Sequence, residues 1–182
     1  MKILVTAFKP FNKLPNNYSM EVLKYIDDVD KLIIDVNYDR CYQEIICNYD
    51  LYNYDFIIAL GEARMRDELT VESQALNLAS CSIPDNCGIL KQNETIILDS
   101  NDILKTKINL DEISGFVKIS NDAGKFVCNN LYYHLLYNHP NKSLFIHIPN
   151  CHDNDSEYVK NANLIMKIIS VLYSHIEKEG EI

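Results

Sequence analysis

Short apolar runs rich in β-branched residues alternate with stretches whose apolar residues have helical spacing in the first half of the chain. The runs predict buried strands at residues 2–8, 32–36 and 55–60, the last ending at Gly61. The helical spacing predicts two helices, one from an Asn16 or Asn17 cap through Ile26 and one over 40–48. Strands that alternate with helices are typical of a parallel sheet covered on both faces.

The second half is less regular. It predicts strands at 72–80, 95–98, 115–120 and 144–148. A helix over 128–138 is expected to end near Pro140. A long amphipathic helix over 158–178 places five apolar residues inward: Leu164, Ile165, Ile168, Ile169 and Leu172. The tail at 177–182 is expected to fray.

Length and charge bound the class of protein. A chain of 182 residues predicts one domain over 1–182. The formal net charge of −9 argues against a nucleic-acid partner, because nucleic-acid binders present basic patches. The N-terminal apolar run is too short for a signal peptide, and no run is long enough to span a membrane. We therefore expect a cytoplasmic protein whose six cysteines are reduced.

One cysteine has an unusual setting. The stretch Asn121–Asn130 is a turn of small residues that delivers Cys128 to the first turn of a predicted helix. Backbone N–H groups and the positive end of the helix dipole converge there, which favours a thiolate and suits an oxyanion. A free cysteine is more often a small buried hydrophobe, and the other five are interpreted as core or surface thiols.

His147 is the candidate base. It lies near the carboxyl end of the predicted strand 144–148, and the strand at 115–120 leads to Cys128 at the same rim of the sheet. The other four histidines are expected to be solvated. Cys151 and His152 lack the paired spacing of a zinc site, so no metal is expected. Dinucleotide, Walker A, serine-hydrolase and HExxH motifs are absent from the sequence.

Glu72 is a third candidate. A carboxylate beside the histidine would fix its tautomer and stabilise the imidazolium. Glu72 has apolar neighbours, but sequence logic alone does not select it from 26 acidic residues.

Four blocks of residues resemble the pyroglutamyl peptidase I (pyrrolidone-carboxylate peptidase) family of cysteine peptidases. They occur in the family's order. The blocks are Thr6–Phe11 with Asn17, Ser19 and Glu21; Gly61–Asn77 followed by Ile83–Gly88; Ser120–Asn129; and Phe145–Pro149.

The resemblance implies an α/β three-layer sandwich with a twisted, mainly parallel sheet and helices on both faces. It implies Cys128 as nucleophile, His147 as acid–base and Glu72 as its orienter. The substrate-binding residues would be Phe8, Phe11, Glu62, Phe126 and Val127. The family removes N-terminal pyroglutamate from peptides without a cofactor, and is typically a cytoplasmic homo-oligomer, a tetramer or dimer.

Some positions depart from the family pattern. The family usually has glutamine at Glu62 and arginine at Ser82, and glycines at Ala7, Asn12, Lys13, Arg64 and Met65. A charged Glu62 is costly to bury in a pocket for a neutral lactam, and pairing with Arg64 or Arg66 would neutralise it. Two alternatives therefore stay open: a related cysteine hydrolase with altered N-terminal specificity, and a non-catalytic binding protein on the same fold.

Overall fold

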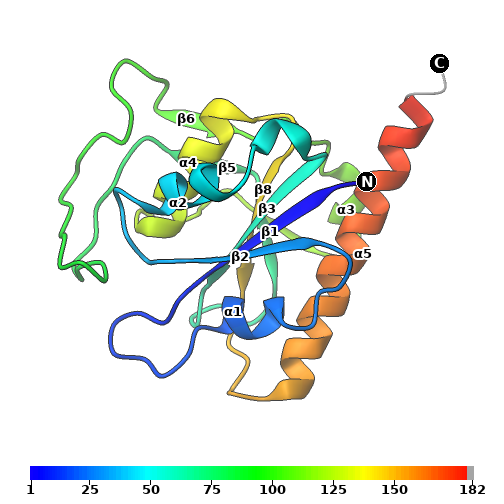
Figure 1. The fold of residues 1–182 in the computed structure, drawn as a ribbon, viewed down its shortest axis with the longest axis horizontal. Helices are drawn as coiled ribbons and strands as arrows, with labels where there is room; N and C mark the ends of the chain where they lie inside the picture. The colour runs from blue at the N-terminus through cyan, green and yellow to red at the C-terminus, as the bar shows by residue number, and fades with distance from the viewer. Residues whose placement is uncertain (180–182) are drawn as a thin grey trace.

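The computed structural model describes residues 1–179, and its main feature is a six-stranded sheet (Figure 1). The strands follow the order β2-β1-β3-β8-β4-β7. Their bounds are β1 Ile3–Phe8, β2 Asp30–Ile34, β3 Phe56–Glu62, β4 Thr70–Glu72, β7 Lys118–Ser120 and β8 Ser143–Ile148. A separate two-stranded sheet pairs β5 (Gln74–Leu76) with β6 (Ile103–Lys105).

The sheet is mainly parallel, as the resemblance implied. β1, β2, β3 and β8 run in one direction, whereas β4 pairs with β8 antiparallel and with β7 parallel. The reversed strand β4 brings a segment from the middle of the chain against the end of β8. This pairing sets the geometry of the site described below.

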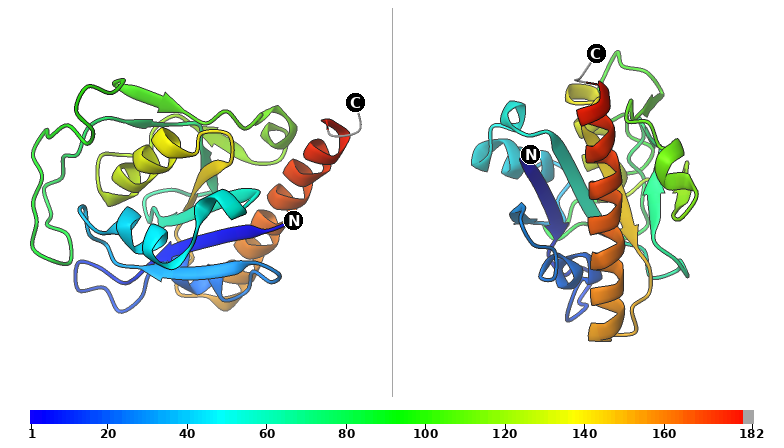
Figure 2. Two further views of the ribbon diagram at one scale, coloured as in Figure 1. Left: turned by 45° about the horizontal axis from the view of Figure 1, so that its top comes forward. Right: turned by 90° about the vertical axis from the view of Figure 1, so that its right-hand side faces the viewer.

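Helices cover both faces of the sheet, which makes three layers (Figure 2). One face packs against α1 (Tyr18–Leu23), α3 (Asp111–Ser114) and the long helix α5 (Asp155–Glu179). The other face packs against α2 (Cys41–Asn48) and α4 (Val127–Asn138). A 3₁₀ turn, η1, spans Leu51–Asn53. In residues 1–179, no helix combines the length and apolar character needed to cross a bilayer.

The sequence pattern of β1 explains its central place. All six of its residues are buried, and alternate side chains enter the two cores. Ile3, Val5 and Ala7 face the α5 side, while Leu4 and Phe8 face the α4 side. A strand buried on both faces needs a continuous apolar run, which is the pattern expected for residues 2–8.

Several predicted elements are confirmed with shifted ends. Asn17 caps α1, its side chain accepting from the Ser19 N–H, but this helix ends at Leu23 rather than near Ile26. The strand expected to end at Gly61 continues through Glu62. The inward residues of α5 are buried or partly buried, as expected. The predicted frayed tail lies partly in α5, which reaches Glu179, and residues 180–182 lie outside the described chain.

Two strand predictions are wrong. Residues 72–80 do not form one strand, because β4 ends at Glu72 and β5 belongs to the second sheet. Residues 95–98 form no strand; Asn77 binds this segment instead, its side-chain oxygen accepting from the Ile96 and Ile97 N–H groups. Helix α3 was not expected.

Candidate active site

The antiparallel pairing of β4 with β8 brings Glu72 and His147 together. Thr70 lies opposite His147 in the register, and Glu72 lies opposite Phe145, which precedes His147 by two residues on β8. Side chains two apart on a strand share a face, so Glu72 and His147 are diagonal neighbours. Glu72 Oε1 lies 2.7 Å from His147 Nδ1. Glu72 is 0% exposed and His147 is 4% exposed, which shields this pair from water.

Arg66 contacts the same carboxylate oxygen, Glu72 Oε1, as His147 does. Its guanidinium donates to Glu72 Oε1 at 2.5 Å, to the Thr70 hydroxyl, and to the backbone carbonyl of Asp122 at 2.7 Å. The Tyr132 hydroxyl donates to the backbone carbonyl of Glu72 at 2.7 Å. From the sequence, Arg66 was expected only as a possible partner for Glu62. The separation of Arg66 and Glu72 along the sequence does not predict their ion pair, because the loop between β3 and β4 brings the two residues together.

Electrostatics favour an ionised Glu72 beside a neutral His147. Burial lowers the pKa of His147 below its ordinary value, outweighing the opposite effect of the Glu72 carboxylate. Burial alone would raise the pKa of Glu72, but the hydrogen bond from His147 Nδ1–H and the positive charge of Arg66 hold that pKa below its ordinary value. A neutral imidazole with Nδ1–H fixed by a carboxylate leaves Nε2 free to accept a proton.

Cys128 lies in the first turn of α4, as the sequence predicted. Gly124 has a φ of +77° in the turn that leads there, and Phe126 precedes the helix in an extended conformation. No side chain caps α4. The first N–H groups of a helix have no partners within it, so those of Val127 and Cys128 are suited to hold an oxyanion.

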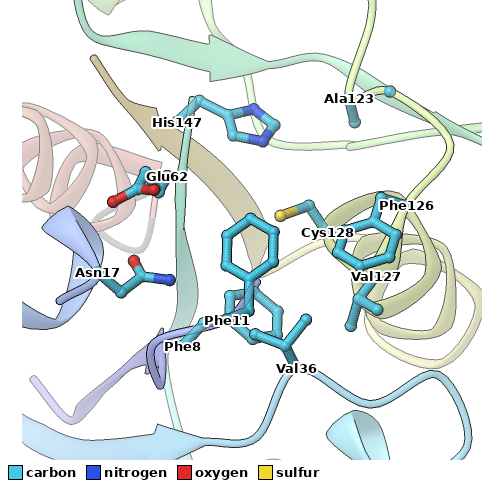
Figure 3. Close-up of a pocket in the computed structure, with 11 residues that line it drawn as sticks. Phe8, Phe11, Asn17, Val36, Glu62, Ala123, Phe126, Val127, Cys128 and His147 are labelled. Atoms are coloured by element: carbon cyan, nitrogen blue, oxygen red, sulfur yellow. The ribbon is translucent and has the colours of Figure 1, made fainter. Parts of the chain in front are cut away.

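Gly61 makes room for the sulfur. A Cβ at position 61 would lie 2.9 Å from Cys128 Sγ and 2.7 Å from the nearest ring carbon of Phe145. Gly61 is also the register partner of His147 across β3 and β8. The sulfur therefore lies against the strand next to His147, and Figure 3 shows both side chains facing one pocket.

The charge state of Cys128 differs from the expectation. Burial raises the pKa of its thiol to about 12, and the negative charges of Glu72 and Glu62 add to that effect. The helix dipole favours the thiolate, yet desolvation at this site is larger. The resting site therefore contains a thiol beside a neutral imidazole rather than a preformed ion pair.

The pocket beside Cys128 is small and mostly apolar, with a volume of about 140 Å³. The five side chains predicted to bind substrate all line it: Phe8, Phe11, Glu62, Phe126 and Val127. Three further residues line it to which the sequence analysis assigned no substrate-binding role: Asn17, Val36 and Ala123. The Phe11 and Phe126 ring centroids lie 5.7 Å apart, so the two rings pack against each other where they line the pocket (Figure 3).

The loop that carries Phe11 has a backbone conformation that is typical of glycine, although it contains no glycine. Asn12 and Lys13 have φ values of 52° and 60°, in the left-handed region that favours glycine. This agrees with the glycines that the family usually has at these two positions. Asparagine tolerates this conformation better than lysine does.

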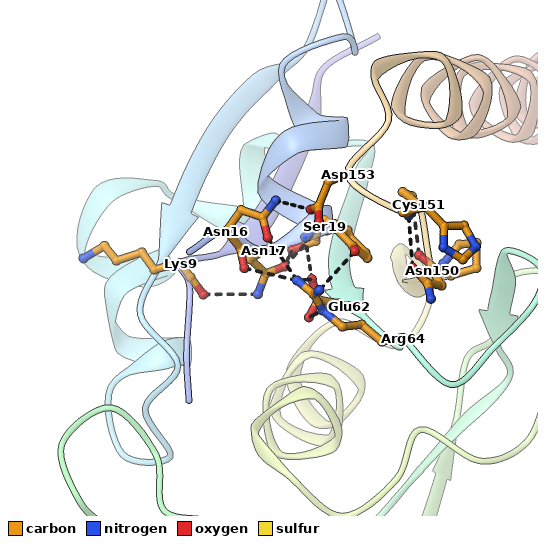
Figure 4. Close-up of polar contacts among 12 residues, drawn as sticks. Lys9, Asn16, Asn17, Ser19, Glu62, Arg64, Asn150, Cys151 and Asp153 are labelled. Carbon is orange, nitrogen blue, oxygen red and sulfur yellow. Dashed lines mark hydrogen bonds and ion pairs between the residues drawn. The ribbon is translucent and has the colours of Figure 1, made fainter. Parts of the chain in front are cut away.

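Glu62 is paired with Arg64 rather than with Arg66. Arg64 Nε donates to Glu62 Oε1 at 2.7 Å, and Nη2 donates to Oε2 at 3.1 Å. The Tyr18 N–H also donates to Oε2 at 2.7 Å. Of the two partners expected for Glu62, Arg64 is the one the structure provides (Figure 4).

The remaining cysteines and histidines do not line this pocket. Cys41 and Cys151 are buried, Cys47 and Cys87 are exposed, and no cysteine forms a disulfide. His139 is buried, contrary to the expectation that it is solvated, and the side chain of His175 lies outside the described part. Over the described chain, His, Cys, Asp and Glu side chains form no group of three arranged to hold a metal ion.

The chain resembles known proteins over nearly its full length. A family model described as pyroglutamyl peptidase matches residues 1–164. The pyrrolidone-carboxylate peptidase of Staphylococcus saprophyticus is 30% identical, with 97% of this chain and 92% of that protein covered. That of Brachyspira hyodysenteriae is 34% identical over 82% of this chain and 83% of that protein.

Solved structures have the same fold. The crystal structure of the pyrrolidone carboxyl peptidase from Fervidobacterium islandicum superposes with a TM-score of 0.81 at 23% identity, covering 98% of this chain and 99% of that one. The Thermus thermophilus enzyme gives 0.75 at 24% identity, covering 95% and 99%. Together with the family match, these similarities show that the chain belongs to the pyroglutamyl peptidase family of cysteine peptidases.

Proposed function

We propose that this protein removes an N-terminal pyroglutamyl residue from peptides, with Cys128 as nucleophile, His147 as acid–base and Glu72 as the residue that orients His147. The observation that carries the proposal is the position of the apolar pocket, which is lined by both Cys128 and His147. Pyroglutamate has a flat, uncharged ring without a terminal ammonium. A small pocket bordered by Phe11 and Phe126 suits such a ring.

The first step is attack of Cys128 Sγ on the pyroglutamyl carbonyl carbon. Because the resting sulfur is a thiol, its proton passes to His147 Nε2 as the bond to carbon forms. Glu72 stabilises the resulting imidazolium through Nδ1. The N–H groups at the start of α4 hold the oxyanion, and one such donor typically lowers the barrier by about 3–4 kcal/mol.

The second step breaks the peptide bond. His147 gives its proton to the departing amine, which leaves a pyroglutamyl thioester on Cys128. Water, activated by the now neutral His147, then attacks the thioester and releases pyroglutamate and the free thiol. Side chains of the protein donate and accept the proton in every step of this reaction, so we propose that no cofactor takes part.

The alternative with altered specificity needs a free carboxylate at position 62 to bind an ammonium group. The structure gives Glu62 three donors, two of them from a guanidinium, so its charge is already balanced. This contact favours a neutral substrate.

We further propose that the protein acts in the cytoplasm as a homo-oligomer, a dimer or tetramer. Six free cysteines suit a reducing compartment. Exposed Leu90 and Leu98, in the segment between Ala79 and β6, offer apolar surface for a second copy. Light scattering coupled to gel filtration measures the mass; a monomer at micromolar concentration would contradict the oligomer.

Hydrolysis of a fluorogenic pyroglutamyl amide tests the function. We expect turnover by the wild-type protein and none by Cys128→Ala, with matching circular dichroism spectra. Alanyl and leucyl amides serve as controls with a free α-amine and are not expected to react. Absence of pyroglutamyl turnover in the folded wild-type protein would refute the proposal.

A further inference from the structure

Glu62 is the one acidic side chain that lines the apolar pocket, among the described residues. Its side chain is 3% exposed, so water can do little to solvate its charge. A buried carboxylate without a partner is costly, and it would also attract any cation that enters the pocket. The identity of its partner therefore affects what the pocket binds.

Arg64 supplies the compensating charge in a fixed position. The guanidinium forms two hydrogen bonds with Glu62, at 2.7 Å and 3.1 Å, one to each carboxylate oxygen. Such a planar two-point pair is stronger and more directional than a contact with a lysine. Arg64 itself does not line the pocket, so it balances the charge from behind the wall.

Other contacts hold Arg64 in this place. Its guanidinium lies 4.0 Å from the centre of the Tyr18 ring, and Nη1 donates to the Tyr18 hydroxyl at 3.0 Å. Nη2 donates to Asn16 Oδ1 at 3.0 Å, and Asn16 in turn donates to Asp153 (Figure 4). The segment before α1 and the loop before α5 therefore hold Arg64 in place. With Arg64 held, the Glu62 side chain has little freedom to rotate away from its ion pair.

We propose that Arg64 is a specificity-determining residue: by neutralising Glu62, it makes the pocket accept an uncharged lactam ring and disfavour a protonated amine. This inference rests on the proposed function and names the residue that sets its substrate preference. Its consequence is that loss of Arg64 leaves a carboxylate in the pocket wall that keeps the Tyr18 N–H as a donor but has lost its compensating positive charge.

A matched pair of ligands distinguishes a pocket in which Arg64 neutralises Glu62 from a pocket in which the charge of Glu62 is uncompensated. Pyroglutamyl and prolyl amides contain the same five-membered ring, but the prolyl ring has a protonated amine in place of the lactam group. In Arg64→Met, we expect kcat/KM for the pyroglutamyl amide to fall at least about tenfold, since an uncompensated buried charge is strongly unfavourable. On a Cys128→Ala background, where nothing turns over, we expect Arg64→Met to bind prolinamide at least about tenfold more tightly.

The double variant Glu62→Gln/Arg64→Met removes both charges. We expect it to lose the gained prolinamide affinity and to recover preference for the neutral ring. Arg64→Gln keeps donors but lacks charge, so it should behave like Arg64→Met and replaces that variant if Met is not tolerated at this position. Arg40→Met removes a positive charge from an exposed residue and should leave both ligands unaffected.

Two results would overturn the inference. One is unchanged prolinamide affinity in both Arg64→Met and Arg64→Gln. The other is a double variant that binds prolinamide as tightly as Arg64→Met does, which would show that Arg64 acts through packing. Because prolinamide titration needs no catalysis, it gives a result even if the wild-type protein hydrolyses neither amide, an outcome that refutes the proposed function instead.

Discussion

Gly61 lies directly against the sulfur of Cys128, where an added Cβ would stand 2.9 Å from Sγ. The same Cβ would lie 2.7 Å from Phe145, a fully buried ring in the core beside α4. Position 61 therefore controls how closely the Cys128 sulfur approaches β3, the strand that pairs with the His147 strand β8. No side chain fits there without moving the sulfur or the ring.

We expect Gly61→Ala to lower kcat at least about tenfold, because a misplacement of about 1 Å can cost roughly 100-fold in rate. Forcing a methyl group into this packed space should also lower the free energy of unfolding by about 1–3 kcal/mol. Steady-state kinetics and thermal unfolding measure the two effects. Gly115→Ala is the control, since a Cβ there meets nothing within 4 Å. Equal activity in the two variants would contradict the close approach.

Glu72→Gln should keep the fold and reduce kcat by about 10²–10⁴-fold, the usual contribution of acid–base catalysis. Without the carboxylate, the imidazolium formed during attack loses its stabilising charge at 2.7 Å. KM should change little, because Glu72 does not line the pocket. A variant whose KM rises while kcat stays constant would instead assign Glu72 to substrate binding.

Removal of His147 should slow alkylation of Cys128 by iodoacetamide. The raised pKa of the thiol means that reaction at neutral pH depends on a nearby base that takes its proton. In His147→Ala, we expect the labelling rate of Cys128 at pH 7.5 to fall at least about tenfold, in line with the loss of a general base. Peptide mass spectrometry follows Cys128 and the exposed Cys47 in the same sample. Equal slowing at both cysteines, or none at Cys128, would rule out this coupling.

Stability should fall as the pH drops below 6.5. The pKa of His147 is lower in the folded state than its ordinary value of 6.5, so the unfolded chain binds its proton first. The pKa of Glu72 is likewise lower than its ordinary 4.5. Each of these two groups contributes fully to the free energy of unfolding above its pKa in the unfolded chain. That contribution is lost as the pH falls through the pKa of the group in the folded protein.

Thermal unfolding from pH 8 to pH 4 measures this loss. We expect a nearly flat midpoint above pH 6.5 and a decline below it. His147→Asn lacks the titrating ring, so its midpoint should decline less than that of the wild-type protein between pH 6.5 and 5. Parallel curves for the two proteins over that interval would mean that His147 is not buried in its neutral form.

The strands of the central sheet were predictable because each side chain of β1 and β8 is buried, which requires an unbroken apolar run. The region from β4 to β6 was not. The chain leaves one sheet after Glu72 and enters another at Gln74, a change that no local periodicity records. Side-chain contacts such as those of Asn77, rather than a strand pattern, order the segment near Ile97.

The same limit applies to the site. Cys128 was recognisable because a turn and a helix start are local features. The pairing of Glu72 with His147 depends on an antiparallel register between segments 75 residues apart, and only the family resemblance pointed to it. Arg66 was not assigned to this pair, because its partner is set by the loop that joins β3 to β4.

The central claim is that Cys128 forms a covalent bond with the pyroglutamyl group. Acid quenching during turnover of an activated pyroglutamyl ester, for which release of the acyl group is slow, followed by peptide mass mapping tests it most directly. We predict one pyroglutamyl group on the peptide that contains Cys128, and none in Cys128→Ala. Turnover with no modified cysteine, or with the group on a different cysteine, would contradict the claim.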